Sequence, residues 1–442
     1  MAIKENTFHI ITLGCAKNLV DSASLAITLG SENMHETDHA RQAKYIIVNT
    51  CGFIHDAREE SLGTLREYAR KKRQGQYLIA AGCLSQRYQE RLRDEVNGID
   101  GLIGTRNLRD IITLTRKLKQ GVKETGVLDH DHILYQQSIP SYAIQGGSAY
   151  LKIADGCRRA CAFCAIPLIK GTLISREREA IIQDALDLQS SGIKEINLIA
   201  QDVTDFQHET GRPDALADLL SEMLPQLPEV PWLRLLYTFP GYVSDRLADL
   251  MAADNQLLPY LDMPLQHADP SVLLSMNRPS NMDWVRNLIA KLRANVPHLV
   301  TRTTLIVGFP TETEQAFETL KNFVQEIQFD RLGVFTYSPE VGTPAEKLGD
   351  PIPQAVKQAR LAELMELQAA ISYRKNQSLV GQKFDLLVEG VDPSQNVLIG
   401  RTWREAPEVD GLVIATGKAL VGDMTQVKIT GALEHDLYAE QI

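Results

Sequence analysis

Short apolar runs rich in β-branched residues alternate with longer charged segments of helical period in the first part of the chain. The runs are Phe8–Leu13, Tyr45–Asn49 and Tyr77–Ala81. Buried strands separated by amphipathic helices are the pattern of a parallel α/β sheet. We therefore expect an amino-terminal parallel α/β domain over residues 7–120. The stretch that follows is rich in turn-forming residues and predicts a linker over residues 121–142.

The same alternation restarts at Ala149 and continues for six rounds. The candidate strands are Ala149–Ala154, Glu195–Ala200, Leu233–Thr238, Tyr260–Pro264, Val300–Val307 and Arg331–Tyr337, with helical patterns such as Arg176–Ser190, Ala215–Leu227, Trp284–Ala294 and Thr313–Ile327 between them. Six β-then-α units predict a partial (βα)6 barrel with its active site at the carboxyl ends of the strands. A doubly wound sheet is the alternative. We assign residues 143–376 to this domain, including a long helix from Gln354 to Asn376.

The tail changes to short β-prone runs separated by Gly, Pro, Asn and Asp. These runs are Lys383–Glu389, Val397–Ile399, Leu412–Ala415 and Met424–Ile429. The pattern predicts a small antiparallel β-barrel over residues 377–442. From residue 376 on, the tail holds five Lys or Arg and ten Asp or Glu, a net charge of −5.

Composition narrows the class of protein. The 442 residues are 44% hydrophobic and 23% charged, which excludes disorder of the whole chain. A net charge of −10 argues against a chain built mainly to hold nucleic acid. No apolar run is long enough to span a membrane. Six cysteines are too few for a disulfide scaffold, and no targeting leader opens the chain, so we expect a cytoplasmic protein with reduced thiols.

Three cysteines form a C-x3-C-x2-C run directly after the first strand of the central domain. They are Cys157, Cys161 and Cys164. Three thiolates on one flexible loop can hold a 4Fe-4S cluster by three irons and leave the fourth iron open. An open iron can chelate the amino and carboxylate groups of S-adenosylmethionine. A zinc site is the alternative, but it wants a fourth ligand, and no histidine lies between Gln136 and Gln207.

The other three cysteines are far apart in sequence but share a topological position. Cys15, Cys51 and Cys83 each follow one of the amino-terminal candidate strands, and each has a glycine beside it. Parallel strands place their carboxyl ends along one rim of the sheet, so these thiols are expected to meet. We favour a second 4Fe-4S cluster with an open iron. Three buried structural cysteines are the alternative.

These motifs resemble a known family. The cysteine loop, with Phe163 before its last cysteine, resembles the signature of the radical S-adenosylmethionine enzymes. The blocks Thr12–Ser22, Val48–Phe53 and Ala81–Ser85 resemble those of the methylthiotransferases. The likeness spans essentially the whole chain. It implies an amino-terminal domain with an auxiliary 4Fe-4S cluster, a central radical domain and a carboxyl-terminal TRAM barrel.

The resemblance also implies roles for individual residues. The two cysteine triplets match the ligands of the auxiliary and radical clusters, and no catalytic side chain is implied beyond them. The residues that match cofactor-binding positions are Phe163, Gln201, Asp202 and Arg302. Later blocks that match the pocket lining are Pro264–His267, Thr301–Thr304 and Gly308–Glu312. Thr311 departs from the family, which usually has glycine there, and Ala16 stands where proline is common.

Structural alternatives exist for these polar residues. Without the resemblance, Gln201, Asp202 and Arg302 would be interpreted as caps of strand ends or members of ion pairs. His267 would be interpreted as a hydrogen-bonding residue and not as a metal ligand.

The implied reaction is methylthiolation of the β-carbon of an aspartate in small-subunit ribosomal protein twelve. It uses two S-adenosylmethionine-dependent steps, two 4Fe-4S clusters and a low-potential electron donor such as flavodoxin. A sister branch that modifies an adenosine of transfer RNA is the alternative. The acidic tail disfavours RNA binding by the barrel, and the segment Trp403–Asp410 resembles the protein-modifying branch. A non-enzymatic iron–sulfur carrier or scaffold is a second alternative.

Overall fold

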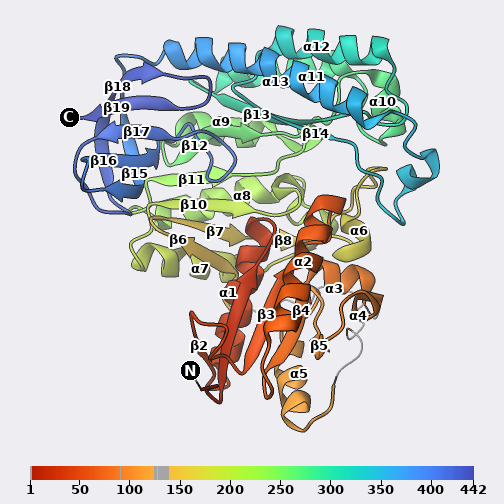
Figure 1. The fold of residues 1–442 in the computed structure, drawn as a ribbon. Helices are drawn as coiled ribbons and strands as arrows, with labels where there is room; N and C mark the ends of the chain where they lie inside the picture. Colours follow the sequence, from red (N-terminus) through yellow and green to blue (C-terminus); the bar gives the residue numbers. More distant parts are fainter. Residues whose placement is uncertain (1, 90, 124–126, 128–138) are drawn as a thin grey trace.

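The computed structural model describes residues 2–89, 91–123, 127 and 139–442, and most of the linker predicted over residues 121–142 lies outside them. Figure 1 shows an amino-terminal domain in red and orange, a central domain in yellow to cyan, and a small barrel in blue. Within the described ranges, no helix has the length and apolar character needed to cross a membrane.

The amino-terminal domain is a three-layer sandwich around a parallel sheet with strand order β2-β1-β3-β4-β5. Its strands are β1 (Thr7–Thr12), β2 (His35–Glu36), β3 (Tyr45–Thr50), β4 (Tyr77–Gly82) and β5 (Gly101–Leu102). Its helices are α1 (Ala16–Gly30), α2 (His55–Lys71), α3 (Cys83–Tyr88), α4 (Arg91–Glu95) and α5 (Asp110–Lys119). Alternate residues of β3 face opposite layers, since Tyr45 packs with α1 and α5 while Ile46 packs with α2. The predicted parallel α/β domain is confirmed.

The central domain is an open, seven-stranded sheet with order β14-β13-β12-β11-β10-β7-β6. The strands are β6 (Tyr142–Gln145), β7 (Ser148–Lys152), β10 (Glu195–Ile199), β11 (Trp232–Leu235), β12 (Leu257–Asp262), β13 (Val300–Val307) and β14 (Arg331–Thr336). The six strands from β7 to β14 are parallel, which confirms the predicted partial barrel. The seventh, β6, was not predicted. It pairs antiparallel with β7 through a tight turn in which Gly146 has a φ of +59°.

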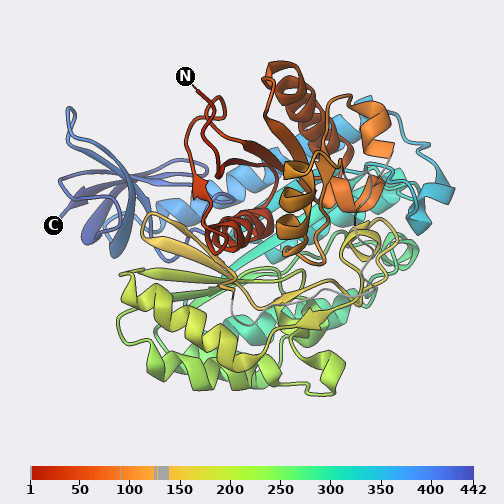
Figure 2. The same cartoon turned by 90° about the horizontal axis from the view of Figure 1, so that it is seen from below.

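Six helices of this domain cover one side of the sheet. They are α7 (Arg178–Ser190), α8 (Ala215–Met223), α9 (Asp245–Ala253), α11 (Met282–Asn295), α12 (Glu314–Ile327) and α13 (Gln354–Gln377). Their apolar faces and the strands form the largest hydrophobic core of the molecule. Figure 2 shows the green helices α7, α8 and α9 below the sheet and the red helix α1 against its other side, where it contacts β6 and β7. This one-sided arrangement distinguishes the fold from a doubly wound sheet, which has helices on both faces.

The tail forms a closed five-stranded barrel. Its strands follow the order β15 (Lys383–Asp392), β16 (Val397–Arg401), β17 (Val413–Thr416), β19 (Leu437–Gln441) and β18 (Met424–Ala432). The barrel prediction is confirmed with two differences. The last strand, β19, was not predicted, and it pairs parallel with β17, so the barrel is not purely antiparallel. This strand closes the sheet and removes its free edge.

Buried ion pairs attach the barrel to the central sheet. Glu195 in β10 is fully buried and accepts hydrogen bonds from Arg401 of β16 at 2.6 Å and from Arg234 of β11 at 2.9 Å. Burial by itself would raise the pKa of Glu195, but the two guanidinium groups lower it to about 2. Arg331 of β14 similarly pairs with Glu405 of the barrel at 2.8 Å. The barrel is therefore held in one position relative to the sheet.

Candidate functional site

All three domains contribute to one cavity of about 490 Å³ at the carboxyl ends of the parallel strands. The cavity is lined by all six cysteines of the chain, Cys15, Cys51, Cys83, Cys157, Cys161 and Cys164. Thus two triplets that are widely separated in sequence face the same space.

The first triplet lies at the rim of the amino-terminal sheet, as its sequence positions predict. Cys15 precedes α1, Cys51 follows β3, and Cys83 opens α3 directly after β4. The neighbouring glycines let these loops approach one another closely. A Cβ on Gly14, whose φ is +95°, would lie 2.8 Å from Cβ of Cys51. A Cβ on Gly82 would lie 2.2 Å from Oδ1 of Asn49.

Cys51 and Cys83 of this triplet are buried, whereas Cys15 is exposed. Burial raises the pKa of Cys51 and raises that of Cys83 well above its usual range. Lys170 lies close enough to Cys83 to oppose this effect. Because ligands must be deprotonated, cluster binding at this triplet would release protons.

The second triplet lies on the loop between β8 (Ala154–Asp155) and α6 (Ile166–Ile169). Backbone N–H groups point at its sulfurs, since Arg159 N lies 3.4 Å from Cys157 Sγ and Ile166 N lies 3.5 Å from Cys164 Sγ. Burial raises the pKa of Cys157 to about 11 and that of Cys164 to about 12, while the hydrogen bonds from these N–H groups oppose the rise in pKa. Donors aimed at sulfur favour thiolate ligands.

The spacing of the thiols bears on which inorganic group would fit. Within each triplet the thiols are near enough to influence one another's pKa. Nevertheless, in the described part of the chain, no three His, Cys, Asp or Glu side chains are placed to hold a single metal ion. A zinc ion needs ligand atoms about 2.0–2.3 Å from one centre, whereas an iron–sulfur cube binds each thiolate at a separate corner. Three thiols in each triplet match a cube that is held at three corners.

The four predicted cofactor-contacting residues all line the cavity. They are Phe163, Gln201, Asp202 and Arg302. Gln201 donates a hydrogen bond to Asp155 at 2.9 Å, while its buried Oε1 has no partner among the described residues. Such an orphaned acceptor at a cavity wall fits a ligand that donates a hydrogen bond.

Asp202 and Arg302 already have ionic partners. Asp202 pairs with Arg159 at 3.0 Å and caps the 3-10 helix Val203–Asp205. Arg302 pairs with Asp262 at 2.9 Å and with Asp410 of the barrel at 3.5 Å. Asp202 and Arg302 thus form the cap and ion pairs of the structural alternative, and they also line the cavity.

The later sequence blocks differ in their placement. Pro264, Gln266 and Thr304 line the cavity, whereas no residue of the block Gly308–Glu312 does. The expectation that this block lines the pocket was wrong, because Glu312 instead accepts a hydrogen bond from Arg360 at 2.9 Å and bonds to the Gly308 N–H. His267 is buried and lies 3.2 Å from Glu312, in agreement with a hydrogen-bonding role.

Sequence reasoning missed several other residues of the cavity wall. Lys17, Tyr237 and Arg278 line it, as do Pro407, Glu408 and Val409 from the loop between β16 and β17 of the barrel. Arg278 Nη1 lies 3.7 Å from Cys161 Sγ. The sequence indicated the barrel loop only through the resemblance of Trp403–Asp410 to the methylthiotransferases. A loop has no hydrophobic periodicity from which the buried residues could be predicted.

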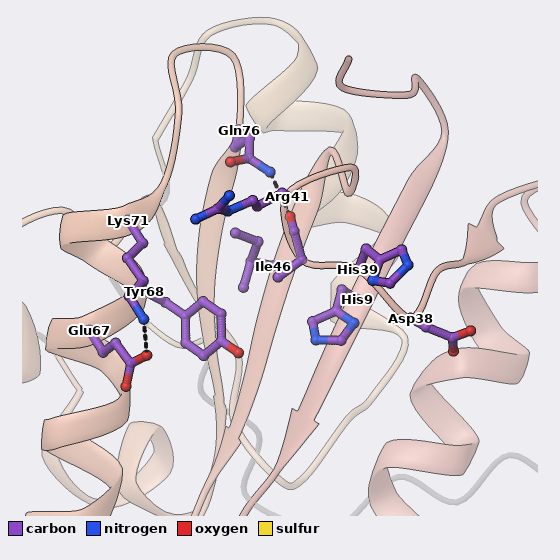
Figure 3. Close-up of a pocket in the computed structure, with 10 residues that line it drawn as sticks. His9, Asp38, His39, Arg41, Ile46, Glu67, Tyr68, Lys71 and Gln76 are labelled. Atoms are coloured by element: carbon purple, nitrogen blue, oxygen red, sulfur yellow. Dashed lines mark hydrogen bonds and ion pairs between the residues drawn. The ribbon is translucent and has the colours of Figure 1, made fainter. Parts of the chain in front are cut away.

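A second cavity, of about 400 Å³, lies on the amino-terminal domain between α2 and the strands β1 and β3. Figure 3 shows that its wall mixes both signs of charge, with Arg41 and Lys71 near Asp38 and Glu67, together with the imidazoles of His9 and His39. Some of these groups are satisfied locally, since His9 Nδ1 lies 2.7 Å from Thr37 O and Lys71 pairs with Glu67 at 2.5 Å. None of the predicted site residues lines this cavity.

Comparison with known families matches each domain. The family described as "Uncharacterized protein family UPF0004" matches residues 7–104, the radical SAM superfamily matches residues 151–324, and the TRAM domain matches residues 380–442. Among solved structures, a radical S-adenosylmethionine methyltransferase, TsrM from Kitasatospora setae, is similar with a TM-score of 0.58 and 13% identity, covering 77% of this chain and 73% of that one. At this identity the likeness concerns the fold alone.

Full-length relatives are more informative. A protein from Roseiflexus sp. (strain RS-1) named "Ribosomal protein uS12 methylthiotransferase RimO" is 43% identical, covering 98% of this chain and 97% of its own. A protein of the same name from Geobacter sulfurreducens is 38% identical over the full length of both chains. The chain therefore belongs to the RimO family of radical S-adenosylmethionine methylthiotransferases.

Proposed function

We propose that this enzyme transfers a methylthio group to the β-carbon of an aspartate in ribosomal protein uS12. The observation that carries the proposal is the single cavity lined by cysteines from two domains. A carrier or scaffold would have no need to aim two thiol triplets at one shared cavity. The names of the full-length relatives point to the same protein substrate.

Membership of the radical SAM superfamily implies a 4Fe-4S cluster and S-adenosylmethionine. In our proposal Cys157, Cys161 and Cys164 hold this cluster in the central domain, residues 143–376. The cysteines at positions 15, 51 and 83 hold a second one in residues 7–120, and residues 377–442 form the barrel. When bound, these groups supply the one-electron chemistry and the sulfur that amino-acid side chains cannot provide.

The side chains around the cavity position the reactants and exclude water. Gln201 offers its free Oε1 to the bound S-adenosylmethionine, and Phe163 offers a ring face beside it. Asp202 and Arg302 act beside them through ion pairs that fix their positions. The aromatic side chains Phe53 and Phe239 and aliphatic side chains such as Leu236 complete a wall that limits the access of water to reactive species.

The charge of the barrel supports a protein substrate. Its exposed side chains include five carboxylates, on Asp385, Glu408, Asp423, Glu434 and Glu440, but only two lysines, Lys383 and Lys418. Arg401, one of its two arginines, is buried against Glu195. Such a surface attracts a basic ribosomal protein and repels RNA phosphates. A ribosomal substrate implies a cytoplasmic enzyme, and a low-potential carrier such as flavodoxin would supply electrons.

Two cysteine variants test the proposal with anaerobically reconstituted protein. Cys161→Ala should abolish the formation of deoxyadenosine under reduction. Cys83→Ala should keep this product but lose methylthiolation of uS12, measured as a mass shift of one methylthio group. Modification of transfer RNA in place of uS12 would overturn the substrate assignment. A wild-type protein with both clusters and no deoxyadenosine would support the carrier alternative instead.

A further inference from the structure

Lys17 and Arg278 are cations of the main cavity that pair with no carboxylate among the described residues, but Arg278 already donates to Pro264 O and approaches Cys161 Sγ. Lys17 lies in the first turn of α1, two residues after Cys15, and lines the cavity half-buried. Arg159, Lys170 and Arg302 on the same wall each pair with carboxylates. Within the ranges that the structure describes, Lys17 forms no ion pair with any carboxylate. Its charge is therefore available to an incoming group.

The ring of Tyr237 fixes the position of this ammonium group. The Nζ of Lys17 lies 3.4 Å from the ring centroid, a cation–π contact. Tyr237 has a φ of +65°, which is strained for an aromatic residue. Two hydrogen bonds hold it there, from Tyr237 N to Asp262 at 3.2 Å and from Val203 N to Tyr237 O at 2.9 Å. Strain of this kind persists where the fold enforces it, often at binding sites.

The surroundings of Lys17 define the ligand that it suits. A carboxylate that enters a cavity lined in part by Leu236, Phe163 and Phe239 loses part of its hydration, which is costly unless a cation replaces the water. An ammonium group that contacts an aromatic ring on one side still has N–H donors on its other side, and these can bind an anion. We infer that Lys17 is a substrate-binding residue that takes the carboxylate of the target aspartate. This inference rests on the proposed function and names the residue that recognises the acidic side chain.

The experiment compares two labelled peptides of the uS12 target loop, one with the aspartate and one with asparagine at that position. Their affinities for the anaerobically reconstituted enzyme are measured by fluorescence anisotropy. The wild type should bind the aspartate peptide about tenfold more tightly or better, the effect of one charge-assisted hydrogen bond. Lys17→Gln should bind both peptides as weakly as the wild type binds the asparagine peptide. Lys17→Arg should keep the preference, as should the control Lys119→Gln on the exposed end of α5.

Several outcomes separate the possibilities. An equal loss for both peptides in Lys17→Gln, or an unchanged preference, would overturn the inference in favour of a structural role. If Lys17→Gln does not retain its iron, the variant Tyr237→Leu tests the inference instead. Loss of the ring should reduce the preference for the aspartate peptide, and an unchanged preference would contradict the inference. A wild type that does not methylthiolate intact uS12 would refute the proposed function, whereas methylthiolation without a preference for aspartate would refute only the role of Lys17.

Discussion

Lys170 of the central domain lies 3.0 Å from Asp21 of helix α1 in the amino-terminal domain. The same lysine lies 2.9 Å from Asp155, and Lys152 contacts both carboxylates, so four buried charges form one network across the domain boundary. Asp155 also receives a hydrogen bond from Gln201 in the cavity wall. The network thus fixes one cysteine triplet relative to the other.

Replacement of Asp21 should therefore loosen the contact between these domains. Asp21→Ala leaves two buried ammonium groups with one fewer carboxylate, which we expect to lower the free energy of unfolding by about 3–5 kcal/mol. Urea unfolding of the full chain, followed by circular dichroism, measures this effect. Asp38→Ala, at an exposed position of the same domain, is the control and should change stability little. A loss no larger than that of the control would show that the network contributes little.

The buried carboxylate of Glu195 should make stability depend on pH. Its folded pKa is about 2, below the usual 4.5, so its contribution is fully present above pH 4.5 and is lost as the pH falls toward 2. The expected loss is about 3 kcal/mol across this window. Urea unfolding of the cluster-free full-length chain at several pH values measures it. Glu195→Gln should be less stable at neutral pH and show a flatter pH dependence, and an identical slope in both proteins would contradict the assignment.

Gly14 should be essential for the auxiliary triplet. Gly14→Ala places a methyl group 2.8 Å from Cys51 Cβ at a backbone φ of +95°, so it must displace the cysteine loop. We expect the reconstituted variant to bind about half of the iron of the wild type and to keep deoxyadenosine formation. Gly30→Ala is a matched control, because its added methyl group meets open space. Full iron content in Gly14→Ala would argue against a cluster at this triplet.

Glu408 should contribute to the attraction of a basic substrate. It is exposed at the cavity, has a φ of +67°, and accepts a hydrogen bond from Tyr150 at 3.2 Å. Glu408→Gln should raise the KM for uS12 severalfold at low salt with little change in kcat, and the difference should shrink as ionic strength rises. Steady-state kinetics at two salt concentrations tests this. The control Glu440→Gln removes an equal charge from β19, outside the cavity wall, and a KM that rises equally in both would point to general charge alone.

The strands and the rim position of the cysteines could be predicted because both depend on local patterns. Each buried parallel strand is an apolar run. Cys51 and Cys83 follow directly after such strands, and Cys15 lies three residues after the end of β1 at Thr12. The short edge strand β6 and the last strand β19 escaped prediction because exposed residues interrupt their apolar pattern. Strands of this kind are stabilised by their neighbours in the sheet more than by their own sequence.

Contacts between the domains could not be predicted from the sequence. Nothing in the pattern around Lys17 identifies Tyr237, which is distant in sequence, as its partner. Similarly, the acids of the segment Trp403–Asp410 could be solvated loop residues, yet Asp410 pairs with Arg302 and Glu405 with Arg331. Family likeness indicated that Arg302 belongs to the pocket, but not that the barrel supplies its counter-ion.

The loop between β16 and β17 has a consequence for how such enzymes could diversify. It forms part of the reaction chamber, yet it belongs to a small module whose strands contribute no thiol. Exchange of this one loop would alter what the chamber admits and leave the radical-generating machinery intact. New substrate preferences could therefore arise at the periphery of the molecule, without any change to the sulfur-bearing loops.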